Sequence, residues 1–287
     1  MQEFIAHVSS RDVSEVSERD RRSIFAWINT CLDPSTPYLD RTNAVVYQQG
    51  QVIDFTRESK FLPLGILSKQ VSIVWNYSDY AVTCSLNVAL DHIDELWLPG
   101  TEDVFIISIA DHWLIEIYHE GDYFFAQYLA NSKPVPVQCV SIEQDSPITE
   151  QRKAELEHLS HTNMLKALPP FRSVTLTKRS DIVWISLSYP WPHQRLDLRE
   201  SIIHNAELCH IRLLGAFFDG AQLRNTDFRF AMLATASFSH CILDNCNFSA
   251  ANLIRAHFDN ATIRNTHFAQ AKVRDTVWMD AKIDENC

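Results

Sequence analysis

Three short stretches, LRNTDF (223–228), LDNCNF (243–248) and IRNTHF (263–268), repeat one pattern at intervals of twenty residues. Each begins with a large aliphatic residue, has Asn in third place and ends in Phe. A fixed period of this length indicates that successive repeats stack on one another, as in a leucine-rich repeat or a β-solenoid. The period therefore limits the choice of fold before any function is considered.

A shorter period of five residues lies inside the period of twenty. The 90 residues from 196 to 285 divide without a gap into 90/5 = 18 pentapeptides, and the third residue of every one is large and apolar. The first residue is Ala, Ser, Thr or Cys in all but two of them, Leu196 and Ile211. Neither an amphipathic helix nor an alternating strand has a period of five.

This pattern resembles the pentapeptide repeat family, whose motif is a small residue, a variable residue, Leu or Phe, and two more variable residues. The resemblance implies a right-handed quadrilateral β-helix with four pentapeptides in each square coil, about 4.5 coils in all. Residues twenty apart would then lie above one another at the strand spacing of about 4.8 Å. The predicted fold class is an α+β N-terminal domain, an antiparallel β meander with two helices, followed by this β-solenoid.

The third positions would stack into four core columns in which aromatic and aliphatic faces alternate. These core residues include Phe218, Phe238, Phe258 and Trp278; Phe228, Phe248 and Phe268; Leu223 and Leu243; and Leu233 and Leu253. Outside the core, Asn205, Asn225, Asn245 and Asn265 would form an amide ladder beside a column of Arg224, Asp244 and Arg264. Both ladders are interpreted as stabilising an exposed corner, not as a binding site.

The distribution of proline predicts the domain boundary. All eleven prolines lie at or before Pro192, which places an α+β domain at 1–190 and the repeat domain at 191–287. A capping box at Ser17 predicts a first helix, and Ser146-Pro147 predicts the start of a second. Hairpins are predicted at 45–55 with a Gln49-Gly50 turn, and at 71–88, 111–129 and 173–189.

The net charge of the chain indicates which classes of partner are favourable. The formal net charge is 25 − 36 = −11, so nucleic acid and anionic membranes are unfavourable partners and basic proteins are favourable ones. The seven cysteines form no CxxC pair, and one would remain unpaired in any full disulfide scheme, which favours a reducing compartment. The first residues have no basic segment followed by an apolar one, so we expect a cytoplasmic protein.

Candidate catalytic residues are few. Glu155, His158 and His161 have helical spacing but no matching ligands elsewhere, and the simpler interpretation is a solvated helix face. Asp111, His112, His119, Glu120 and Asp122 cluster around the hairpin at 111–129 and could supply an acid and a base, although hairpin ends are ordinarily polar. Without a nucleophile motif or phosphate-binding loop, the sequence predicts no enzyme, no metal and no cofactor.

One group of outward positions on the solenoid is apolar. Leu214, Met232 and Ile254 would cluster on the fourth face near Phe217 and Phe230. Arg212 and Arg274 would lie at the rim of this cluster. An apolar patch with a charged rim predicts either a docking site for a protein partner or a seam with the N-terminal domain. The last coil has no recognisable cap, which also leaves a homodimer through that end as an alternative.

Function is predicted from these features together. The first hypothesis is a non-enzymatic protein-binding protein, such as an immunity or antitoxin protein that sequesters a basic toxin domain. The family resemblance implies an alternative, protection of DNA gyrase by mimicry of duplex DNA. A solenoid of about 22 Å matches six to seven base pairs with about thirteen phosphate charges, whereas residues 196–287 carry only 9 − 11 = −2. A scaffold or effector that uses the solenoid as a rigid arm is the third hypothesis.

Overall fold

The fold is taken from a computed structural model that describes residues 12–31, 44–51, 66–75, 81–96, 103–118, 122–128, 141, 144, 146–188, 195–284 and 287. These residues form two compact units, which we call the N-terminal unit (described residues within 12–128) and the C-terminal unit (described residues within 141–287). The longer of the two segments that make up the C-terminal unit starts at Pro136, whereas the prolines predicted a boundary at 190.

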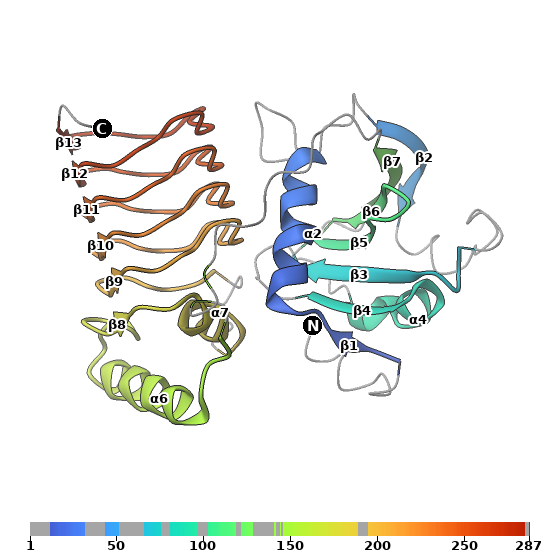
Figure 1. The fold of residues 1–287 in the computed structure, drawn as a ribbon, viewed down its shortest axis with the longest axis horizontal. Coiled ribbons are helices and arrows are strands. Elements are labelled where there is room, and N and C mark those ends of the chain that lie inside the picture. The colour runs from blue at the N-terminus through green and yellow to red at the C-terminus, as the bar shows by residue number, and fades with distance from the viewer. Residues whose placement is uncertain are drawn as a thin grey trace. The chain divides into compact units, whose positions relative to one another are not determined.

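The N-terminal unit is built on an antiparallel sheet of seven strands, drawn in Figure 1. In spatial order the strands are β1 (Ser14–Glu15), β4 (Ala81–Ser85), β3 (Gln70–Trp75), β5 (Val104–Ser108), β6 (Trp113–Ile117), β7 (Asp122–Tyr128) and β2 (Ala44–Gln51). The predicted β3–β4 and β6–β7 hairpin pairings are confirmed. The predicted turn at Gln49-Gly50 is wrong, because β2 continues through both residues and pairs with β7.

Helices cover both faces of this sheet. Helix α2 (Glu18–Cys31) is the predicted first helix, and the Asp20 N–H donates to Ser17 Oγ at 3.2 Å as the capping box requires. Its Trp27 meets Tyr128 of β7 edge to face, with ring centroids 6.3 Å apart. Helices α4 (Leu86–Asp91) and α5 (Ile93–Leu96), which the sequence analysis did not predict, supply Leu86 and Ile93 to the core on the other face.

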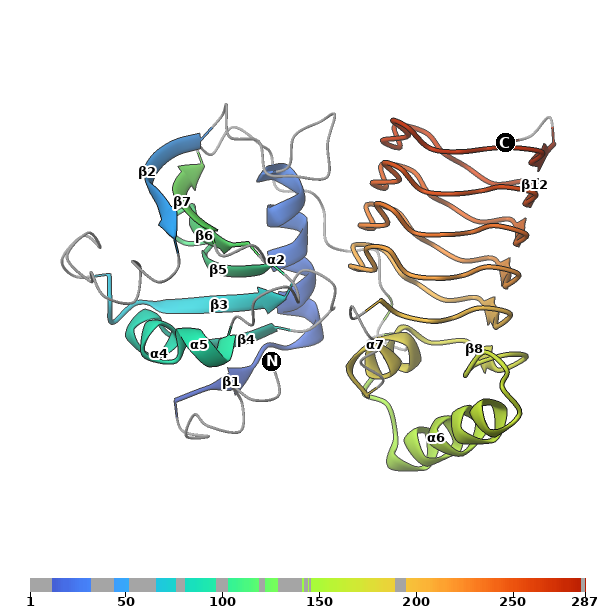
Figure 2. The same ribbon diagram turned by 180° about the vertical axis from the view of Figure 1, so that it is seen from behind.

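The C-terminal unit begins with helix α6 (Glu150–Leu165), strand β8 (Thr175–Leu176) and helix α7 (Arg179–Ser188). Strand β8 pairs in parallel with the first strand of the solenoid, opposite Ile202 and Ile203. Phe171 and Ile182 belong to the same hydrophobic core as the repeats. The predicted hairpin at 173–189 is therefore wrong, because its second half is helical, and these elements cap the N-terminal end of the coils (Figures 1 and 2).

The repeats form the predicted β-solenoid. One strand from each coil joins a parallel sheet: β9 (Ile202–His204), β10 (Gln222–Arg224), β11 (Ile242–Asp244), β12 (Thr262–Arg264) and β13 (Lys282–Ile283). Leu223 lies opposite both Ile203 and Leu243, so residues twenty apart stack as the period predicted. The predicted aromatic columns are also confirmed, with Phe218 and Phe238 stacked at a centroid distance of 4.7 Å.

Candidate functional site

The corners of the solenoid are held in a backbone conformation that the sequence analysis did not identify. Every fifth residue from Glu200 to Asp280 has a positive φ, between 46° and 71°. Non-glycine residues adopt this left-handed region at a cost, and Asn is among those that tolerate it best. The run of Asn at 205, 225, 245 and 265 thus has a backbone cause as well as a side-chain one. Thr235, which is β-branched, has the same conformation at φ 58°.

The predicted amide ladder is present along one corner. Asn225 Nδ2 donates to Asn205 Oδ1 at 3.0 Å, and Asn245 Nδ2 donates to Asn225 Oδ1 at 2.7 Å. The backbone N–H of Asn265 donates to the carboxylate of Asp284 at 3.2 Å. All four Asn residues are exposed, so the ladder forms part of the surface that a partner would meet.

Beside the ladder, the outward side chains of the parallel sheet form the column of alternating charge that was predicted. Arg224 and Arg264 are exposed and Asp244 between them is half-buried. The backbone pairs Arg224 with Asp244 and Asp244 with Arg264. The next column along the sheet carries the exposed side chain of Ile242. This face offers both charges together with apolar area.

The apolar cluster predicted on the fourth face is largely enclosed. In the complete chain Leu214, Met232 and Ile254 are 8%, 1% and 1% exposed. Arg212 is also buried, and its Nη1 lies 3.0 Å from Met232 Sδ. The other members of the predicted patch differ in exposure, since Phe217 and Phe230 are half-buried and Arg274 is exposed. The role of this cluster as a docking site or a seam stays a prediction.

The last described coil is the least enclosed part of the solenoid. Its core-column residues Val273 and Ile283 are 44% and 51% exposed, whereas Leu253 and Ile263, one coil earlier, are fully buried. Met279 in the same coil is 62% exposed. The predicted homodimer through this coil stays a prediction.

The acid and base candidates of the hairpin at 111–129 do not meet. Asp111 and His112 lie in the turn before β6, whereas Asp122 begins β7 at the far end of β6. The residues thus flank one hairpin as predicted, but the whole five-residue strand separates Asp122 from Asp111 and His112. The other two members, His119 and Glu120, lie outside the described residues.

Asp111 instead has partners that the sequence did not indicate. Lys69 Nζ lies 2.5 Å from Asp111 Oδ1, and Ser108 Oγ donates to Asp111 Oδ2 at 2.8 Å. The hydrogen bond from Lys69 is the main cause that lowers the pKa of Asp111 below its usual range. Lys69 is 42 residues away in the chain, and only the strand order β3-β5-β6 places the two together.

The second group of candidates lies where the helical spacing predicted. Glu155, His158 and His161 are all exposed on α6, and Glu155 is paired with Arg152 at 2.9 Å. Among the described residues, no group of three or more His, Cys, Asp or Glu side chains is arranged to hold a metal ion. The same part of the chain contains no helix that is long and apolar enough to span a membrane.

The described cysteines differ in bonding and in burial. Cys209 is disulfide-bonded, whereas the thiols of the other described cysteines form no disulfide: Cys31, Cys84, Cys241, Cys246 and Cys287. Four of these thiols are buried and Cys287 is exposed. The number and spacing of the cysteines in the sequence did not predict the disulfide of Cys209.

Comparison with known proteins identifies the repeats. A family model described as Pentapeptide repeats matches residues 201–239 and 233–270. No curated protein matches the chain.

Three solved structures resemble the solenoid. The pentapeptide repeat protein Rfr23 from the cyanobacterium Cyanothece 51142 is 23% identical, with a TM-score of 0.28, over 30% of this chain and 58% of that one. The plasmid-mediated fluoroquinolone resistance protein QnrB1 is 19% identical, with a TM-score of 0.24, over 30% and 42%. A pentapeptide repeat protein from the thylakoid lumen of Arabidopsis thaliana is 26% identical, with a TM-score of 0.13, over 31% and 58%. The matched part thus spans about half the length of each of these proteins.

Proposed function

We propose that this chain, whose residues 201–270 are pentapeptide repeats, is a non-enzymatic protein-binding protein. The observation that supports this most is the fixed register of the exposed columns on the solenoid. Backbone hydrogen bonds tie each coil to the next, as from Asn225 N to Asp244 O at 3.0 Å and from Asn245 N to Arg264 O at 3.0 Å. A surface that is already ordered loses little conformational entropy on binding, and stacked repeats offer an extended binding surface.

The charge of the chain supports a finer proposal, that the partner is a basic protein such as a toxin domain. Residues 1–195 carry 16 − 25 = −9 and residues 196–287 carry 9 − 11 = −2. Opposite charge on the partner would accelerate association at low ionic strength and help to exclude acidic proteins. In this proposal the chain acts as an immunity or antitoxin protein, and the negative charge before the solenoid steers the encounter.

Charge reversal tests this proposal with a matched control. Asp12 and Asp91 are exposed in the N-terminal unit, and Asp275 and Asp280 are exposed on the solenoid. Changing either pair to Lys raises the net charge equally. With a captured basic partner, we expect Asp12→Lys/Asp91→Lys to slow association by about tenfold at low salt. The solenoid pair should have a smaller effect. Equal effects, or unchanged rates for both, would contradict steering by the N-terminal unit.

Protection of DNA gyrase is the second candidate, and the shared repeat is what favours it. The short length and near-neutral charge of the solenoid argue against imitation of duplex DNA. A supercoiling assay with gyrase and a quinolone separates the two candidates. We expect no protection by the full chain, whereas restored supercoiling would favour the second candidate.

The third candidate is a scaffold that uses the solenoid as a rigid arm. For this candidate, the role of Leu214, Met232 and Ile254 can be tested by substitution. If they dock a partner, changing all three to Ser abolishes binding and leaves the melting temperature unchanged. If they stabilise the chain instead, the same change lowers the melting temperature, as burial of apolar side chains predicts. Circular dichroism melting and a binding assay on one preparation distinguish these outcomes.

A further inference from the structure

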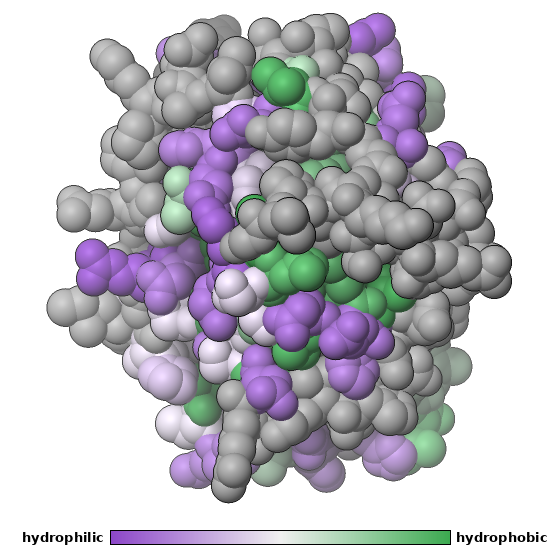
Figure 3. All heavy atoms as spheres, turned by 90° about the vertical axis from the view of Figure 1, so that its right-hand side faces the viewer, coloured by the Kyte–Doolittle hydropathy of each residue, from purple (hydrophilic) through white to green (hydrophobic). Residues whose placement is uncertain are grey.

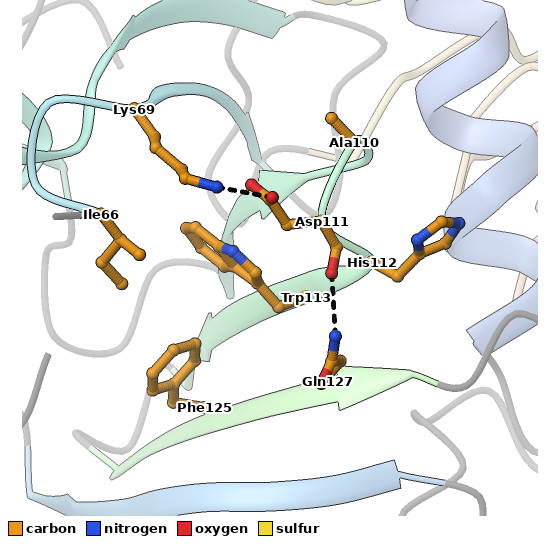
Figure 4. A pocket seen from close by; sticks show the side chains of 8 residues that line it. All are labelled: Ile66, Lys69, Ala110, Asp111, His112, Trp113, Phe125 and Gln127. Atoms are coloured by element: carbon orange, nitrogen blue, oxygen red, sulfur yellow. Dashed lines mark hydrogen bonds and ion pairs between the residues drawn. The ribbon is translucent and has the colours of Figure 1, made fainter. Parts of the chain in front are cut away.

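We propose that a cavity in the N-terminal unit binds a free amino acid with an apolar side chain. The cavity has a volume of about 470 Å³, within the range of small-molecule sites. It lies beside the turn between β5 and β6, and Figure 4 shows its lining. The residues that carry the argument are Lys69 and Asp111 on the polar side, and Ile66, Trp113 and Phe125 on the apolar side.

The polar side of the cavity is an ion pair with bonding capacity left. Lys69 Nζ contacts Asp111 Oδ1 at 2.5 Å, and Asp111 Oδ2 accepts from Ser108 Oγ at 2.8 Å. An ammonium group has three N–H donors, and a carboxylate has about four acceptor positions. The two side chains are 40% and 33% exposed, so both can be reached by a ligand. After these bonds the pair still offers donors and acceptors a few ångströms apart.

The turn that carries Asp111 is held in place from several directions. Gln127 Nε2 donates to the backbone oxygen of Asp111 at 3.1 Å, and Tyr128 N donates to that of His112 at 2.8 Å. The His112 N–H closes the turn onto Ile109 O at 3.2 Å, with His112 at a φ of 56°. Strained residues of this kind occur at ligand sites, where surrounding contacts hold them. The carboxylate is therefore preorganised before a ligand arrives.

The apolar side of the cavity lies next to the ion pair. Trp113 and Phe125 meet edge to face with ring centroids 5.6 Å apart, and Ile66 lies on the same side. Figure 4 shows the Trp113 ring between the ion pair and Phe125, with the His112 ring directed away from it. Figure 3 shows hydrophobic side chains between hydrophilic ones on one face of the molecule. Trp113 and Phe125 are 4% and 1% exposed, so a ligand would reach only the ring edges that line the cavity. The half-buried Ile66 would supply the rest of the apolar contact while the charged end of the ligand meets Lys69 and Asp111.

The neutral total charge of the pair selects a zwitterion. A ligand with only a carboxylate would meet Lys69 favourably and be repelled by Asp111, and a ligand with only an amine would experience the reverse. An amino acid places its carboxylate on Lys69 and its ammonium group on Asp111, so both interactions are favourable. A single-charge analogue of the same size leaves one of them repulsive.

The test uses the full chain and three probes that share a phenylethyl group: L-phenylalanine, 3-phenylpropanoate and 2-phenylethylamine. Isothermal titration should show saturable binding of L-phenylalanine with a dissociation constant in about the millimolar range. Both single-charge analogues should bind at least about tenfold more weakly. Equal binding of either analogue, or no saturable binding of L-phenylalanine or L-leucine up to about 10 mM, would overturn the proposal.

Variants test the assigned residues. Lys69→Met and Asp111→Asn keep side-chain size and should each weaken L-phenylalanine binding at least about tenfold. The matched control is Lys153→Met, which removes an ion pair of 2.7 Å with Glu150 on α6 and should leave binding unchanged. Unchanged binding in both cavity variants would overturn the assignment. The comparison of probes on the unaltered chain needs no variant, so it remains decisive if either variant fails to fold.

Discussion

The rings of Phe228 and Phe248 lie parallel, 9° apart in orientation, with centroids separated by 4.8 Å. Each ring also meets Phe238 edge to face, at 6.2 Å and 5.6 Å. Since the two stacked residues are one coil apart in the twenty-residue period, this contact links the sequence repeat directly to the packing of the core. The contact also identifies the side chains whose truncation should lower the stability of the chain most.

Replacing Phe248 by Ala should destabilise the chain by about 3 to 5 kcal/mol, because the fully buried ring is removed from between two others. The matched control is Val273→Ala, in the same type of core position but 44% exposed. We expect that control to cost less than about 1 kcal/mol. Urea unfolding measures both. A cost below about 1 kcal/mol for Phe248→Ala would contradict the assigned core.

The corners of the solenoid predict a stabilising change. Thr235 has a φ of 58° and is exposed, so Thr235→Asn should raise stability by relieving a β-branched residue of this conformation. The reverse change, Asn225→Val, should lower stability by about 1 to 2 kcal/mol through backbone strain and loss of the ladder. Thermal melting of the two variants checks the signs. A lower melting temperature for Thr235→Asn, or an unchanged or higher one for Asn225→Val, would contradict the corner assignment.

Acidification should weaken the contribution of Asp111. Its pKa is lower in the folded chain than in the unfolded one, so its contribution to stability is present above about pH 4. This contribution is lost as the pH falls through the folded-state pKa. The difference in melting temperature between the unaltered chain and Asp111→Asn should therefore shrink from pH 7 to about pH 3. A difference independent of pH would contradict the Lys69–Asp111 ion pair.

Thiol chemistry should distinguish the described cysteines that form no disulfide. Burial raises the pKa of Cys84 and of Cys246 to about 11, and it raises the pKa of Cys241 well above its usual range. Desolvation also raises the pKa of Cys287, but this thiol is exposed whereas the others are buried. Iodoacetamide at neutral pH should therefore modify Cys287 first. Peptide mass spectrometry measures the order of modification. Rapid modification of Cys241 in the native chain would contradict its place in the core.

The solenoid could be predicted from the sequence because its core pattern is strictly local. The third residue of every pentapeptide is large and apolar. The stacking that follows from this pattern is observed, for example between Leu223 and Leu243. The left-handed corners were missed because Thr235, Phe230 and Arg255 carry no sequence signal for a positive φ. The Gly, Asn and Asp corners do carry such a signal.

The last hairpin was mispredicted for a related reason. Leu176 and Ile182 fit both a strand pattern and a short buried helix, and such apolar runs are ambiguous without knowledge of their partners. Their partner is the end of the solenoid, which β8 extends as a further strand. The Lys69–Asp111 pair could not be predicted either, because it depends on which strands are neighbours in the sheet.

The most direct test of the proposed function is affinity capture from a lysate of the native host with the full chain as bait and Asp12→Lys/Asp91→Lys as the parallel bait. Mass spectrometry of the eluates identifies what each bait retains. The account predicts a basic protein domain that the unaltered chain retains and the charge-reversed chain loses. Capture of DNA gyrase subunits by both baits alike would contradict it.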